Sequence, residues 1–183
     1  MKYPMTIAGL KRELPICPLT DTLAIGAFVM FGDLELTVAC ADALLKKAPE
    51  FDYLVAPEAK AIPLIYEMAR QRGLDDYLLV RKNKKAYMSG VFEVDVTSIT
   101  TAGTQKLYMD AVDAAKMKDK RIIIIDDVIS TGASLQAVEK LVEAAGGNVV
   151  ARMAVLAEGD AAERDDIIYL ERLPLFNPDG TVK

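Results

Sequence analysis

The chain of 183 residues contains no histidine and no tryptophan, and it has only two cysteines. The lack of histidine excludes imidazole acid-base chemistry, Ser-His-Asp triads and the usual kinds of zinc site. We interpret Cys17 and Cys40 as buried thiols rather than as a disulfide or a metal pair, because they are far apart in apolar surroundings. Any catalysis therefore uses carboxylates, lysines, arginines, backbone groups or a metal held by the substrate.

Long apolar runs are also lacking. No run approaches the roughly 20 residues that a membrane helix needs, and the first residues have no apolar segment of signal-peptide length, so we expect a cytoplasmic protein without a membrane partner. With 52% hydrophobic and 27% charged residues, the composition predicts a single globular domain over residues 1–183. The net charge of −5 disfavours a broad nucleic-acid surface, so no nucleic-acid partner is expected.

The most informative stretch runs from Arg121 to Ser134, with the sequence RIIIIDDVISTGAS. Its four isoleucines predict a central strand buried on both faces of a parallel sheet. The strand is expected to stop at Asp126 and Asp127, at the carboxyl edge where open α/β sheets bind ligands. Apolar residues at helical spacing follow, and the helix is expected to end at Gly146-Gly147.

The loop between this strand and this helix has the composition of an anion site. Residues 130–134 are all small or hydroxylated, so a phosphate can approach the unpaired N–H groups at the start of the helix. The stretch is neither a Walker P-loop nor a dinucleotide fingerprint, because the required lysine and glycines are missing. Two carboxylates before such a loop suit a ligand with both hydroxyls and a phosphate.

The segment IIIIDDVISTGAS resembles the 5-phosphoribosyl-1-pyrophosphate (PRPP) signature of the type I phosphoribosyltransferases. The resemblance implies a doubly wound α/β fold with a mainly parallel five-stranded sheet, in which residues 34–183 form the PRPP-binding core and residues 1–33 form a small hood. It also implies that Asp126 and Asp127 are catalytic residues that contact the ribose hydroxyls. The 5′-phosphate would lie against the loop made by Ser130, Thr131, Gly132, Ala133 and Ser134. The alternative is an acid pair that merely caps the helix after a Rossmann-like strand.

A second segment lies between a predicted strand at 51–57 and a predicted helix. Its residues Glu58, Ala59, Lys60 and Ala61 resemble the Glu-Ala-Arg-Gly pyrophosphate loop of adenine phosphoribosyltransferases, with a different residue at two positions. The resemblance implies that all four bind PRPP, with Lys60 as the cation. The alternative reading makes Glu58 a helix cap and Lys60 a solvated charge.

A basic segment follows a third predicted strand at 78–80. Arg81, Lys82, Lys84 and Lys85 concentrate positive charge in an acidic protein, and such a cluster attracts a polyanion. By resemblance this is the mobile loop that closes over PRPP, and Arg81, Lys82 and Lys85 join the PRPP-binding residues. A charge run of this kind is otherwise a solvated loop.

The stretches 91–100 and 104–110 alternate apolar and polar residues and predict an antiparallel hairpin. Adenine-type members of the family carry a catalytic glutamate after the mobile loop, and Glu93 is the one glutamate near that place. The intervening loop is shorter than in that group, and the alternative is a surface-facing strand glutamate. The remaining predicted elements are a helix at 34–47 capped by Asp33, a strand after Asn148 and a short edge strand with a closing tail at 166–176.

The resemblance implies transfer of ribose 5-phosphate from PRPP to a nucleobase with release of pyrophosphate, as in purine salvage. Mg²⁺ is the implied cofactor, held mainly by PRPP oxygens rather than by a protein cage, and a homodimer is the implied assembly. Ser130 stands where hypoxanthine-guanine enzymes have an aspartate, which disfavours that subgroup. Adenine is the leading base, because the Glu-Ala-Lys-Ala loop and the Val-Arg-Lys segment most resemble the adenine branch. The alternatives are a xanthine or orotate enzyme, a PRPP-binding regulator without turnover, and a receiver-like signalling domain.

Overall fold

The computed structural model describes residues 1–97 and 104–183. Its core is a five-stranded sheet with the strand order β10-β9-β8-β4-β5, and each neighbouring pair is parallel. The strands are β4 (Tyr53–Pro57), β5 (Leu78–Val80), β8 (Arg121–Ile129), β9 (Asn148–Glu158) and β10 (Ile168–Leu173). The isoleucine run lies in the middle strand and is at most 1% exposed, which confirms the predicted buried central strand.

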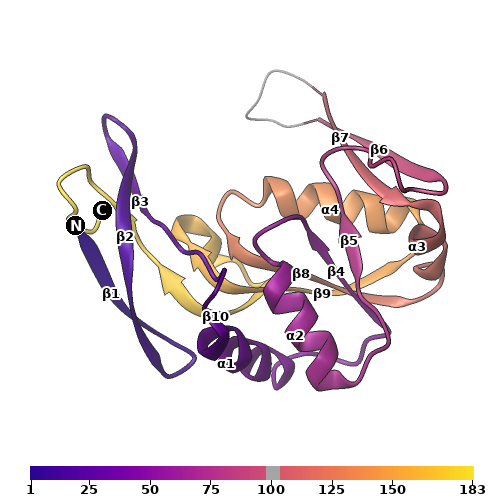
Figure 1. Ribbon diagram of the computed structural model, residues 1–183. Coiled ribbons are helices and arrows are strands. Elements are labelled where there is room, and N and C mark those ends of the chain that lie inside the picture. Colours follow the sequence, from indigo (N-terminus) through magenta and orange to yellow (C-terminus); the bar gives the residue numbers. More distant parts are fainter. Residues whose placement is uncertain (98–103) are drawn as a thin grey trace.

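Helices cover both faces of this sheet (Figure 1). Ile123 and Ile125 pack into the hydrophobic core that contains α1 (Leu34–Leu45) and α2 (Ile62–Arg72). Ile122 and Ile124 face the other way and pack with α3 (Ala111–Lys116) and α4 (Ala133–Ala144). Because successive side chains of a strand point to opposite faces, one run of isoleucines supplies both cores. This arrangement confirms the doubly wound α/β class.

One boundary differs from the prediction, at the end of the central strand. The strand was expected to stop at the acids, but β8 continues to Ile129 and keeps its pairing with β9, so Asp126 and Asp127 lie within it. The buried side chain of Ile129, which is 2% exposed, supports this extension. Helix α1 begins as predicted, because Asp33 Oδ1 accepts a hydrogen bond from Leu36 N at 3.1 Å.

A separate antiparallel sheet with the order β1-β2-β3-β11 contains the N-terminus. Its strands are β1 (Lys2–Ile7), β2 (Leu10–Thr20), β3 (Leu23–Gly26) and β11 (Leu175–Phe176). The edge strand predicted within 166–176 forms as β10, and its closing tail adds β11 to the N-terminal sheet. Pro174 has no N–H to donate and separates β10 in the core from β11 in the N-terminal sheet.

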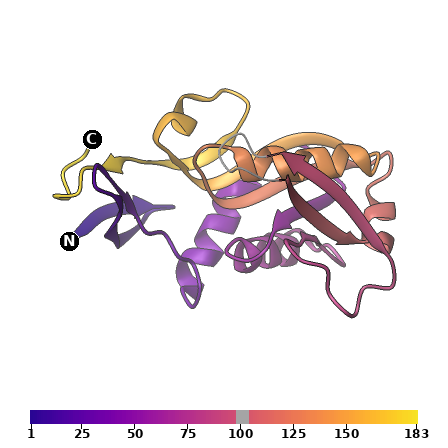
Figure 2. The same ribbon diagram turned by 90° about the horizontal axis from the view of Figure 1, so that it is seen from above.

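The N-terminal sheet adjoins the carboxyl edge of the core sheet. Strand β11 comes directly after the carboxyl end of β10, and a 3₁₀ turn (Gly159–Glu163) follows β9. A Cβ at Gly159 would lie 3.0 Å from Leu175 Cδ1, so the end of β9 touches β11. Figures 1 and 2 show this sheet at one end of the core.

The hairpin forms as β6 (Val91–Thr97) and β7 (Thr104–Asp110), and residues 98–100 of the predicted strand lie outside the described residues. Cys40 is buried but Cys17 is only half-buried, so the prediction of two buried thiols is wrong for Cys17, and both thiols are free. Within the described part of the chain, each helix is too short or too polar to cross a lipid bilayer.

Candidate functional site

Three segments predicted to bind ligand follow three neighbouring strands of the core sheet. The loop at 130–134, called the phosphate loop below, follows β8; the turn at 58–61 follows β4; and the basic segment at 81–85 follows β5. These strands are adjacent and parallel, so their carboxyl ends meet at one edge. The fold therefore brings together residues that are more than 70 positions apart in the sequence.

The acid pair lies at the centre of this edge. Asp126 Oδ1 accepts a hydrogen bond from Asp127 N at 2.9 Å. Asp127 is 5% exposed, and its Oδ2 has no hydrogen-bond partner among residues 1–97 and 104–183. Burial, and then the charge of Asp127, raise the pKa of Asp126 well above its usual range. A buried acceptor without a donor is costly in the free protein, and a ligand hydroxyl would relieve that cost.

Lys60 reaches the acid pair from the neighbouring turn. Its Nζ lies 3.4 Å from Asp127 Oδ2, and its side chain is 56% exposed. Its charge also opposes the rise in pKa of Asp126 and of Glu158, the last residue of β9. Lys60 therefore stands between carboxylates on two strands while remaining accessible to an anion. Sequence reasoning did not select Glu158, because its position depends on which strand lies next to β8.

Glu58 turns toward the basic segment instead of solvent. Its carboxylate accepts hydrogen bonds from Arg81 Nη1 and from Lys82 N, both at 3.0 Å, and Lys85 Nζ lies 3.7 Å away. Burial raises the pKa of Glu58, but these partners outweigh burial and lower it overall. Glu58 thus joins the turn after β4 to the segment after β5, and it is neither a helix cap nor a solvated charge.

The phosphate loop leads into a helix whose N-cap residue has no side chain to cap it. Gly132 occupies the N-cap position of α4 with φ of 78°, a left-handed conformation that favours glycine. Thr131 Oγ1 accepts a hydrogen bond from Ala133 N at 3.4 Å, while the side chains of Ser130, Thr131 and Ser134 are exposed or half-exposed to solvent. The loop therefore presents hydroxyls beside the positive end of a helix, which is a favourable place for a phosphate.

The comparisons agree with this geometry. A family model described as the phosphoribosyl transferase domain matches residues 37–176. The chain belongs to the phosphoribosyltransferase family. It is 30% identical over 180 residues to an adenine phosphoribosyltransferase of Parvibaculum lavamentivorans, covering 96% of this chain and 99% of the relative. It is also 30% identical over 125 residues to an orotate phosphoribosyltransferase of Methanopyrus kandleri, covering 68% of this chain and 57% of the relative.

A solved structure shares the fold. The adenine phosphoribosyltransferase of Thermoanaerobacter pseudethanolicus superposes with a TM-score of 0.63 at 24% identity, over 76% of this chain and 82% of that protein. At this identity the similarity shows the fold alone, and it confirms the type I phosphoribosyltransferase architecture predicted from the sequence.

Glu93 lies on β6, within the hairpin. Its carboxylate pairs with Lys106 Nζ at 2.7 Å across the two strands and is 49% exposed. The ion pair raises the pKa of Lys106. This is the position of a surface-facing strand glutamate, so a catalytic role for Glu93 stays a prediction that requires the ion pair to open.

The protein groups at the edge leave a metal to be shared with the ligand. Within residues 1–97 and 104–183, no three histidine, cysteine, aspartate or glutamate side chains are placed to hold an ion together. The donors at this edge are the carboxylates of Asp126 and Asp127, and among the described residues Asp127 Oδ2 accepts no hydrogen bond. Such hard oxygen donors fit Mg²⁺ that keeps most of its ligands from water and substrate.

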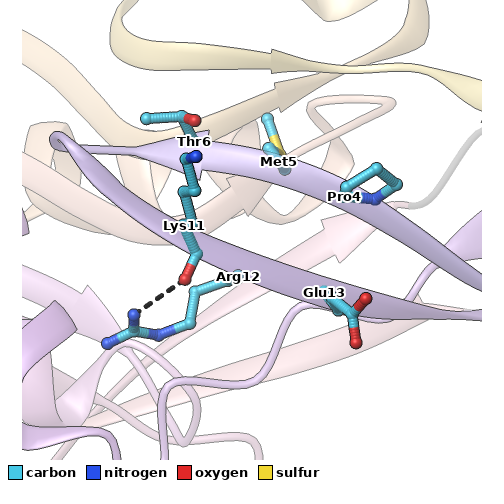
Figure 3. A pocket seen from close by; sticks show the side chains of 6 residues that line it. All are labelled: Pro4, Met5, Thr6, Lys11, Arg12 and Glu13. Atoms are coloured by element: carbon cyan, nitrogen blue, oxygen red, sulfur yellow. Dashed lines mark hydrogen bonds between the residues drawn. The ribbon is translucent and has the colours of Figure 1, made fainter.

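A separate hollow of about 610 Å³ lies along the β1–β2 hairpin, and it contains none of the predicted site residues. It is lined by Pro4, Met5, Thr6, Lys11, Arg12 and Glu13 (Figure 3). Arg12 bonds to Asp33 at 2.7 Å and to Glu35 at 2.9 Å, so its guanidinium secures the start of α1.

Proposed function

We propose that this phosphoribosyltransferase transfers ribose 5-phosphate from PRPP to a purine base and releases pyrophosphate, with adenine as the leading base. The acid pair carries the proposal, because within residues 1–97 and 104–183 Asp127 Oδ2 is buried without a hydrogen-bond partner, immediately before the phosphate loop, and only the ion pair with Lys60 faces it. The names of the relatives support the base class, and they include adenine and hypoxanthine/guanine enzymes. A xanthine or orotate enzyme is the alternative, and the Methanopyrus relative supports the orotate reading.

In this proposal Asp126 and Asp127 accept hydrogen bonds from the ribose hydroxyls, and residues 130–134 hold the 5′-phosphate. The bond from C1 of ribose to a pyrophosphate oxygen breaks, a base nitrogen forms the new bond to C1, and the proton of that nitrogen passes to the released pyrophosphate or to water. The ribose develops positive charge on the way, so two nearby carboxylates stabilise it electrostatically. Bound Mg²⁺ would screen the charge of the pyrophosphate oxygens.

The cationic side chains at the carboxyl edge of the sheet would bind the leaving pyrophosphate. Lys60, Arg81, Lys82 and Lys85 would neutralise pyrophosphate, together with the backbone of Ala59 and Ala61. Glu58 holds Arg81 and Lys85 before the ligand arrives, which gives it a positioning role. The N-terminal sheet, with residues 1–33 as the hood, would cover the base from the carboxyl edge of the core.

Two broader features belong to the proposal. We place the protein in the cytoplasm, because both cysteines are free thiols and reduced thiols are typical there. We propose a homodimer, because Phe31, Leu34, Val38 and Tyr66 are large apolar residues that are all at least 46% exposed. A mass measurement by light scattering tests the dimer, and a monomer at micromolar concentration would contradict it.

The experiment that tests the function measures pyrophosphate release from PRPP and Mg²⁺ with adenine, hypoxanthine, guanine, xanthine, orotate or uracil, each alone. PRPP binding is followed in parallel by calorimetry. Turnover with a purine base is the expected result, and turnover with orotate alone would replace the base in the proposal. PRPP binding without turnover on any base would indicate the regulator, a reading that the Glu93–Lys106 ion pair favours.

A further inference from the structure

Arg164 covers the phosphate loop from the segment that follows β9. A Cβ at Gly132 would lie 2.5 Å from Arg164 Nη1, so the guanidinium occupies the space that a side chain would fill at the N-cap of α4. The Arg164 backbone is fixed by a hydrogen bond from its N to Ala161 O at 3.2 Å, at the end of the 3₁₀ turn. The side chain is 28% exposed, so solvent and ligands reach it.

Asp166 fixes the orientation of this guanidinium. Arg164 Nε donates to Asp166 Oδ1 at 2.8 Å, and Nη2 donates to Oδ2 at 2.7 Å. This two-bond contact fixes the plane of the guanidinium and raises the pKa of Arg164. Within residues 1–97 and 104–183, Nη1 has no hydrogen-bond partner, and it is the nitrogen that faces Gly132.

We infer that Arg164 binds the phosphate held by residues 130–134, which is the 5′-phosphate of PRPP if the proposed function is correct. The loop itself contains no lysine or arginine, so its own donors are hydroxyls and backbone N–H groups. A phosphate carries up to two negative charges, and a guanidinium nitrogen supplies a charge-assisted hydrogen bond that the loop lacks. Asp166 acts as the positioning residue that directs Nη1 toward the loop.

A purely structural role makes a different prediction. If Arg164 only fills the space above Gly132, its removal would lower thermal stability and would weaken all ligands alike. If it binds the 5′-phosphate, its removal weakens only ligands that carry this group. Ribose 5-phosphate and pyrophosphate separate the two roles, because each contains one part of PRPP.

The test compares Arg164→Ala and Arg164→Lys with the wild type by calorimetry, using ribose 5-phosphate, pyrophosphate with Mg²⁺, and PRPP. We expect Arg164→Ala to bind ribose 5-phosphate and PRPP about 10- to 100-fold more weakly, which is the range for a lost charged hydrogen bond. Pyrophosphate affinity should stay within about threefold. Arg164→Lys should recover part of the loss, because it restores the charge but not the fixed plane.

Arg172→Ala is the matched control. Arg172 lies on β10, is 62% exposed and pairs with Glu163, so this variant removes an arginine and its ion pair away from Gly132. It should bind all three ligands as the wild type does. Thermal unfolding of each variant confirms that the protein compared is folded.

Three outcomes would overturn the inference. Unchanged binding of ribose 5-phosphate by Arg164→Ala, in a protein whose wild type turns over PRPP, would overturn this inference alone. An equal loss for pyrophosphate and ribose 5-phosphate would assign Arg164 the structural role. A wild type that binds neither PRPP nor ribose 5-phosphate would overturn the proposed function, and this inference with it.

Discussion

Asp126 is a residue at which binding and stability oppose each other. Its carboxyl is partly buried beside Asp127, and burial followed by that neighbouring charge raises its pKa above 3.8. The folded state therefore holds this proton to a higher pH than the unfolded state does. The contribution of this carboxyl to the free energy of unfolding is fully present below pH 3.8, and it is lost as the pH rises through the folded pKa. Burial and Asp127 raise the folded pKa of Asp126 to about 8, so above that pH the protein holds an unfavourable charge where ribose hydroxyls would bind.

The first prediction concerns Asp126→Asn. The amide preserves the acceptor for Asp127 N but removes the penalised charge, so we expect a higher melting temperature than the wild type at pH 8. The difference should shrink toward pH 4, where the wild-type carboxyl is protonated. PRPP affinity should fall about 10- to 100-fold, because a charged acceptor for a hydroxyl is lost. Thermal unfolding against pH and calorimetry with PRPP measure the two effects.

Asp52→Asn is the control, because the pKa of Asp52 is shifted in the opposite direction and its loss should lower stability. Hydrogen bonds from Arg121 lower the pKa of Asp52 to about 2, so its stabilising effect is present above its unfolded pKa and is lost as the pH falls through about 2. This variant should be less stable than the wild type at neutral pH and should bind PRPP normally, because Asp52 precedes β4 at the amino edge of the sheet. A less stable Asp126→Asn at pH 8, or unchanged PRPP affinity, would contradict the account of the acid pair.

Among the elements, β8 shows what the sequence could and could not predict. Four isoleucines predicted the buried strand because both faces of a parallel sheet require apolar residues. The end of the strand was not predictable, since the pairing of Val128 with Leu156 keeps the chain extended past the acids. The contact between Glu58 and Arg81 was not predictable either, because these residues are 23 positions apart and meet only where β4 and β5 are neighbours. Arg164 belongs to no sequence motif, so its position could not be predicted. Only the path of the chain after β9 brings it to Gly132.

The second prediction concerns the connection between the turn after β4 and the basic segment. In Glu58→Gln the amide still accepts from Lys82 N, but Arg81 and Lys85 lose their anion. We expect pyrophosphate to bind about 3- to 10-fold more tightly at low salt, because a repelling charge is gone, and the difference should shrink in high salt. Stability should fall by about 1 kcal/mol at neutral pH. Calorimetry at two salt concentrations and chemical denaturation measure these changes.

Glu67→Gln provides the comparison. Glu67 lies on α2, accepts bonds from Arg70 and Gln71 and has its pKa lowered to about 2, first of all by the bond from Arg70. Its substitution should destabilise the fold without changing pyrophosphate affinity. Weaker pyrophosphate binding by Glu58→Gln would contradict this prediction, because it would show that the positioning of Arg81 and Lys85 by Glu58 matters more than the repulsion by its charge.

For the whole molecule, the joint between the two sheets determines how the proposed hood meets the core. Phe176 is fully buried on β11 and packs against Tyr3 with the ring centres 5.0 Å apart. A Cβ at Gly26 would lie 3.1 Å from Leu173 and 3.4 Å from Phe176, so there is little spare room between the sheets. The C-terminal strand therefore fastens the N-terminal sheet to the carboxyl edge of β10.

The third prediction uses Phe176→Ala to loosen this joint. Loss of a buried phenylalanine ring costs about 3–5 kcal/mol, and here the loss falls on β11, the strand that joins the N-terminal sheet to β10. If the N-terminal sheet covers the base, KM for the base should rise about 10-fold or more while PRPP affinity stays within about threefold. Steady-state kinetics with the accepted base, calorimetry with PRPP and thermal unfolding measure the three quantities.

Phe51→Ala is the control that separates the effect of lower stability on KM from the effect of loosening the N-terminal sheet. Phe51 is 8% exposed, lies just before β4 at the amino edge of the core and stacks under Arg72 at 5.8 Å. The Phe51→Ala variant should lower the melting temperature about as much as Phe176→Ala does. It should leave KM for the base unchanged at temperatures where the protein is folded. Since each variant removes one buried ring, equal effects on KM would mean that general loosening raises it. The N-terminal sheet would then have no direct part in holding the base.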